Sequence, residues 1–82
     1  MKRYRIQKKG EAYDFDVNEK ATLRDVIFQA CELITDGRSF PRDDGIYDES
    51  GFRMVAFPVF DLPVVIAEEP IGDHWVLTVA PE

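Results

Sequence analysis

Four carboxylates stand close together in the middle of the chain, and carboxylate oxygens are the ligands that hard divalent cations prefer. They are Asp43, Asp44, Asp48 and Glu49. Their spacing lacks the alternating ligands, central glycine and distal glutamate of an EF-hand loop. A solvated acidic loop is therefore the favoured interpretation, and neither a metal nor a cofactor is predicted.

The chain has no residues placed for nucleophilic catalysis. His74 is the only histidine, and beside Asp73 it could titrate near neutral pH. Cys31 falls within a predicted helix, and Ser39 and Ser50 fall in predicted loops, so no nucleophile is paired with a base. The sequence predicts a protein that is not an enzyme.

Composition limits the partners of the chain. Its 82 residues predict one domain spanning 1–82, with ten basic and sixteen acidic side chains and a net charge of −6. An acidic domain is repelled by phosphate backbones, which disfavours direct nucleic-acid binding and leaves mimicry of nucleic acid as an alternative. One cysteine, no signal-peptide pattern and no membrane-spanning stretch favour a cytoplasmic protein without membrane contact.

Residues 1–17 predict a β-hairpin that turns at Lys9-Gly10. The alternation of apolar and charged residues fixes its register, because a slip by one residue would exchange the two faces. The predicted pairs are Lys8 with Glu11, Ile6 with Tyr13, Arg5 with Asp14, Tyr4 with Phe15, and Arg3 with Asp16.

An amphipathic helix is predicted next, with Thr22 as N-cap, Asp25 completing a capping box and Gly37 at its end. Phe28 points away from the apolar stripe and lies beside Glu32, so it is a candidate partner contact or an aromatic ring half covered by a loop. The stripe comprises Leu23, Val26, Ile27, Ala30 and Ile34, with Leu33 at its edge.

Residues 36–51 are turn-rich and predict a long loop, which Phe40, Ile46 and Tyr47 could anchor. A strand over 52–57, an edge strand over 60–66 interrupted by Pro63, turns over 68–73 and a last strand over 74–79 follow. Trp75 is predicted to lie in the core with Leu77 and Val79.

Anchor residues near both ends of the chain carry a family resemblance. Turn and cap positions are Gly10 and Thr22, and the apolar positions are Tyr13, Phe15, Val17, Leu23, Val26, Ala30, Ile66, Ile71, Leu77 and Val79. In type and spacing this set resembles the ubiquitin-like (β-grasp) superfamily. The resemblance implies an α+β fold of order ββαβββ, with a mixed sheet packed on one helix and an extended loop after the helix.

The chain ends Val79-Ala80-Pro81-Glu82 and lacks the terminal Gly-Gly of conjugating members, so a non-conjugating type is expected. The expected function is a protein-interaction module or accessory subunit that docks on a larger protein, as a monomer or weak homo-oligomer. The alternatives are a structural subunit of an oxygenase-type complex and an acidic phage or defence-related inhibitor. The candidate partner-binding residues are Phe28, Phe40, Asp43, Asp44, Tyr47, Asp48 and Glu49.

Overall fold

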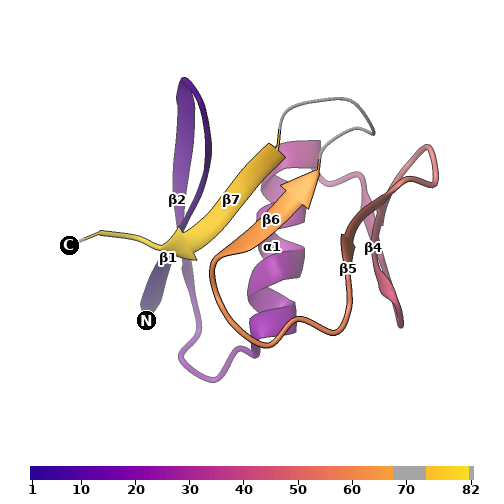
Figure 1. Cartoon of the computed structure of the whole chain (residues 1–82). Coiled ribbons are helices and arrows are strands. Elements are labelled where there is room, and N and C mark those ends of the chain that lie inside the picture. Colours follow the sequence, from indigo (N-terminus) through magenta and orange to yellow (C-terminus); the bar gives the residue numbers. More distant parts are fainter. Residues whose placement is uncertain (68–73, 82) are drawn as a thin grey trace.

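A computed structural model describes residues 1–67 and 74–81. Seven strands and one helix are found in this part of the chain (Figure 1). In chain order they are β1 (Lys2–Lys8), β2 (Glu11–Val17), α1 (Leu23–Thr35), β3 (Ser39–Arg42), β4 (Gly45–Asp48), β5 (Arg53–Ala56), β6 (Val64–Ala67) and β7 (His74–Val79).

The N-terminal hairpin has the register that the alternation predicted, from Lys8 opposite Glu11 to Arg3 opposite Asp16. On its outer face Arg5 binds Asp14 through two contacts, Nε to Oδ1 at 2.7 Å and Nη2 to Oδ2 at 3.1 Å. The hydrogen bond from Arg5 lowers the pKa of Asp14 below its usual 3.8. The pair therefore stabilises the hairpin at neutral pH, and this contribution is lost as the pH falls through the lowered pKa.

Reversing the charge of Arg5 tests this cross-strand pair. Arg5→Asp is expected to lower the thermal unfolding temperature slightly, because it sets two carboxylates opposite each other. Adding Asp14→Arg should recover most of the loss at pH 7 by restoring opposite charges. Thermal melts of the wild type, both single variants and the double variant give the coupling. Strict additivity of the two single effects would contradict the pairing.

Helix α1 begins as predicted. The Thr22 side chain accepts from the Asp25 amide at 3.2 Å, and the Asp25 carboxylate accepts from the Thr22 amide at 3.0 Å, which completes the capping box. At the other end the C-cap is Asp36, which is itself left-handed (φ 54°) and is followed by Gly37 at φ 79°. The buried residues of the helix are Val26, Ile27, Ala30 and Cys31.

The predicted β-grasp fold is wrong. All strand pairings in the described residues are antiparallel, and they form a four-stranded sheet of order β2-β1-β7-β6 and a three-stranded sheet of order β3-β4-β5. The mixed sheet expected from the resemblance is not formed, because β7 runs antiparallel to β1 with Ile6 opposite Leu77. Alternating apolar residues suit either strand direction, so the sequence pattern did not fix it.

The predicted loop over 36–51 is also wrong, because it contains the hairpin of β3 and β4. Its turn is Asp43-Asp44, between the paired residues Arg42 and Gly45. The strand predicted over 52–57 is β5, and the one over 60–66 shortens to β6, which does lie at a sheet edge after Pro63. The turns predicted over 68–73, and Ile71 among the anchors, fall outside the described residues.

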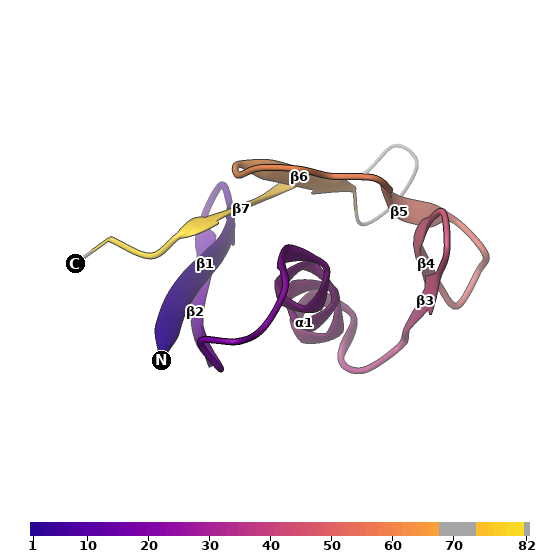
Figure 2. The same ribbon diagram turned by 90° about the horizontal axis from the view of Figure 1, so that it is seen from below.

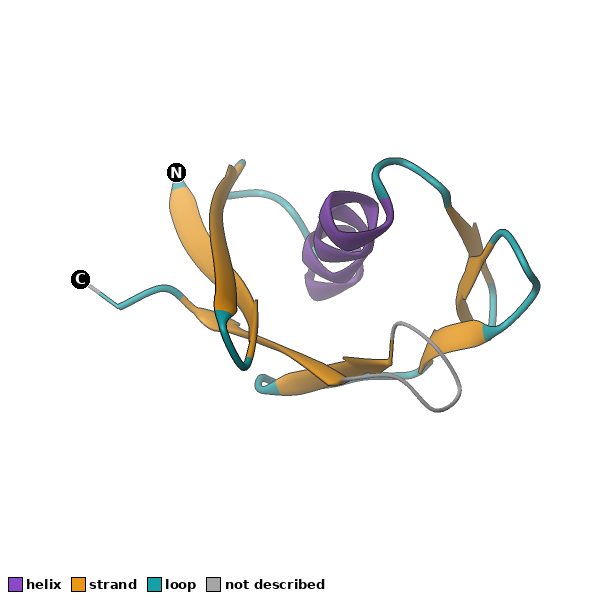
Figure 3. Ribbon diagram, turned by 90° about the horizontal axis from the view of Figure 1, so that it is seen from above, coloured by secondary structure: helices purple, strands orange, loops and turns teal. Residues whose placement is uncertain are grey.

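The two sheets form an arc around the helix, which lies in its hollow (Figures 2 and 3). Trp75 is buried there as predicted, together with Leu77, whereas Val79 is mostly exposed. Within the described residues no helix has the length and apolar character to cross a membrane. The core consists of Ile6, Val17, Val26, Ile27, Ala30, Cys31, Ile46, Met54, Val55, Val64, Ile66, Trp75 and Leu77.

Candidate functional site

The outer face of the three-stranded sheet brings two of the candidate residues together. Phe40 and Tyr47 are directly paired across β3 and β4, and the buried residues Ser39 and Ile46 alternate with them along these strands. The Phe40 side chain is 51% exposed, whereas Tyr47 is half-buried. The Arg42 guanidinium lies 5.0 Å from the centre of the Tyr47 ring and so covers part of it.

Asp44 links this face to the neighbouring strand. Its Oδ2 atom accepts a 2.8 Å hydrogen bond from the Tyr47 hydroxyl and lies 3.2 Å from Nη1 of Arg53. The bond from Tyr47, together with the charge of Arg53, lowers the pKa of Asp44, and the same bond raises the pKa of Tyr47. We call Phe40, Arg42, Asp44, Tyr47 and Arg53 the hairpin face.

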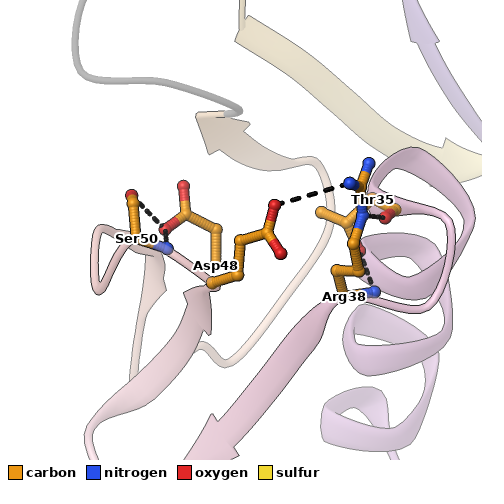
Figure 4. Close-up of polar contacts among 5 residues, drawn as sticks. Thr35, Arg38, Asp48 and Ser50 are labelled. Carbon is orange, nitrogen blue, oxygen red and sulfur yellow. Dashed lines mark hydrogen bonds and ion pairs between the residues drawn. The ribbon is translucent and has the colours of Figure 1, made fainter.

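Asp48 bonds to Ser50 in the turn after β4 (Figure 4). Oδ1 of Asp48 accepts from the amide of Ser50 at 2.9 Å, from its hydroxyl at 2.6 Å and from the Phe52 amide at 3.0 Å. Desolvation raises the pKa of Asp48, but these hydrogen bonds together outweigh it and lower the pKa. Glu49 contacts Arg38 at 3.4 Å, and Arg38 in turn donates to the Thr35 carbonyl at 3.0 Å.

Asp43 projects from the hairpin turn and is exposed, while its carbonyl oxygen accepts from Nη2 of Arg24 at 3.1 Å. Arg24 and Arg38 therefore attach the hairpin to both ends of α1. In the described residues no three His, Cys, Asp or Glu side chains gather as metal ligands, so Asp43, Asp44, Asp48 and Glu49 are not brought together around a cation. Sequence reasoning identified the carboxylates but missed their arginine partners, because only the folded chain brings them together.

Phe28, the remaining candidate, lies apart from the hairpin face. Its ring is half-buried against the core and lines a groove of about 580 Å³ between α1 and the end of β2. Val17, Ala21 and Glu32 line the same groove. The ring therefore packs against the core instead of pointing away from the apolar residues of the helix, and it is also part of a concave surface.

Of the residues considered for chemistry, Cys31 and His74 lie in different environments. Cys31 is fully buried, and desolvation together with the nearby charge of Glu32 raises the pKa of its thiol to about 12. A thiol with so high a pKa is almost entirely protonated at neutral pH and is a poor nucleophile. His74 is exposed at the start of β7, and its neighbour Asp73 falls outside the described residues.

Fold and surface together define a small, mostly antiparallel β protein in which two sheets curve around one side of a single helix, and one of these sheets presents a face that contains aromatic residues and arginine. Comparison of the chain with protein-family models, with curated proteins and with solved structures found no match.

Proposed function

We propose that this protein is a non-enzymatic interaction module, or an accessory subunit, that docks on a larger protein through its hairpin face. The observation that carries the proposal is the half-exposed ring of Phe40 beside Tyr47 and Arg42. Aromatic residues and arginine are enriched at protein interfaces and dominate their binding energy. Phe40 is exposed and lies beside a tyrosine and an arginine, so it has the properties of an interface anchor residue.

The surroundings of Phe40 support this role because they are already held in place. Asp44 fixes the Tyr47 hydroxyl and Arg53, and Arg24 and Arg38 attach the hairpin to the helix. A surface that is ordered before binding loses less conformational entropy on association. Since Asp44 and Glu49 are paired with arginines of the same chain, an aromatic anchor, rather than free negative charge, is the main attraction offered to the partner.

Matched phenylalanine variants test the proposal. Wild type, Phe40→Ala and Phe60→Ala are used as baits in extracts of the native host, and the retained proteins are quantified by mass spectrometry. Phe60 is the control, because it is 87% exposed but lies in the connection between β5 and β6. We expect at least one partner protein to bind the wild type and the Phe60→Ala variant equally well. The same partner should bind the Phe40→Ala variant about ten-fold or more weakly.

Circular dichroism melts verify that both variants stay folded, as the exposure of both rings leads us to expect. If every protein retained by the wild type is also retained by Phe40→Ala, the hairpin face is not the docking surface. If the purified protein were found to convert a small-molecule substrate into a product, that catalytic activity would contradict the non-enzymatic role.

A further inference from the structure

Strand β2 lies at one edge of the four-stranded sheet and, among the described strands, pairs only with β1. In an antiparallel pair every second residue directs its N–H and C=O groups away from its partner. Over Glu11–Val17 the outward-facing groups form an open edge to which another strand can be added. Strand addition of this kind is a common way of binding an extended peptide.

The groove at Phe28 lies at the C-terminal end of this open edge, where the last two residues of β2, Asp16 and Val17, line it. It is lined on one side by the last residues of β2 and on the other by α1, with Val17, Ala21 and Phe28 as its apolar part. Figure 2 shows β2 at one end of the arc, with the helix beside it and no strand covering this side of the helix. An added strand that passes the end of β2 would place alternate side chains beside the apolar lining there.

The charge of the groove is of one sign. Asp16, Asp25 and Glu32 line it, and none of the other described residues that line it is a lysine, arginine or histidine. Asp16 is paired with Arg3. Oε2 of Glu32 is shielded from solvent and lies near Gly37 at the end of α1, so only the other part of this side chain is available to a partner. The carboxylates that line the groove carry negative charge, which favours a partner segment that carries cations.

From these features we infer that β2 and α1 form a second docking site, distinct from the hairpin face, for an extended segment of a partner protein in which apolar residues alternate with lysine or arginine. The segment adds to β2 as a new strand, with its apolar side chains against Phe28 and its cations near Asp25 and Glu32. A second copy of this chain is a poorer occupant, because pairing β2 with itself would bring together two strands that each carry Glu11, Asp14 and Asp16.

Capped synthetic octapeptides test this inference directly. One alternates valine with lysine and the other alternates valine with glutamate. Each is titrated into the ¹⁵N-labelled full chain, and amide shifts are followed by NMR. We expect the lysine peptide to shift the amides of β2 and of the helix around Phe28, to bind about ten-fold or more tightly than the glutamate peptide, and to weaken as salt is added.

Two charge-reversal variants distinguish binding at the groove from non-specific electrostatic attraction of a basic peptide to an acidic protein. Glu32→Lys should weaken binding of the lysine peptide about five-fold or more. Asp61→Lys makes the same charge change in the connection between β5 and β6 and should leave binding of this peptide nearly unchanged. The unfolding temperature of each variant confirms that it is folded.

Three results would overturn the inference: no binding of the lysine peptide up to about 1 mM, equal affinity for both peptides, or equal weakening by the two reversals. Shifts confined to the hairpin face would also overturn it while leaving the proposed docking through Phe40 intact.

Discussion

Truncation of Ile27 to alanine is expected to lower the free energy of unfolding by about 2–5 kcal/mol, because it opens a cavity in the centre of the core. Ile27 is fully buried on the face of α1 that meets the two sheets. A domain of this size has about 5–15 kcal/mol of stability in total, so the loss is a large fraction of it. Urea unfolding followed by circular dichroism measures the change.

Leu33→Ala is the matched control for this prediction. It removes a side chain of the same volume from the same helix, but Leu33 is 44% exposed and leaves little cavity. We expect it to cost less than about 1 kcal/mol. Lys20→Ala, in the exposed segment before the helix, should have a still smaller effect. Similar losses at Ile27 and Leu33 would show that the helix buries a different face.

Replacement of Gly45 by alanine is expected to disrupt the three-stranded sheet. Gly45 begins the central strand β4 at φ 154°, and an added Cβ would overlap the carbonyl oxygen of Val55 and lie 2.9 Å from Cδ of Arg53. Backbone strain alone costs about 1–3 kcal/mol, and here a neighbouring strand must also move. We expect a total loss above about 3 kcal/mol, measured by urea unfolding.

The Gly51→Ala variant distinguishes the cost of steric overlap from the cost of a left-handed backbone conformation. Gly51 also has a positive φ, of 90°, but an added Cβ would have no atom within 4 Å. Only the cost of the left-handed backbone applies there, about 1–2 kcal/mol. If the Gly45 and Gly51 variants lose the same stability, the close approach of β4 to β5 at Gly45 is not as described.

The sequence by itself determined the elements that depend on neighbours along the chain. The register of the first hairpin follows from its two-residue turn and from alternation that a slip would reverse, and Arg5 and Asp14 are paired as those rules require. The start of α1 follows from the reciprocal bonds of Thr22 and Asp25, which need only a helical turn between them.

The hairpin of β3 and β4 contained a signal that could have been used. Asp43-Asp44 is followed by Gly45, which is a turn sequence, and short strands flank it. These two strands have four residues each and include Pro41 and two charged residues, so their alternation is too weak to be recognised alone. Their stability comes from contacts that are distant in sequence, such as the burial of Ile46 and the bonds from Arg24 and Arg38.

Only the tertiary structure decided the direction of β7, the division into two sheets and the surroundings of the candidate residues. Strand direction depends on how the chain returns to β1, and Ile6 and Leu77 would bury equally well in either orientation. Phe28 and Phe40 are both aromatic residues in an acidic chain. The fold makes one the lining of a groove and the other a half-exposed ring, because packing between distant segments determines which side chains remain accessible.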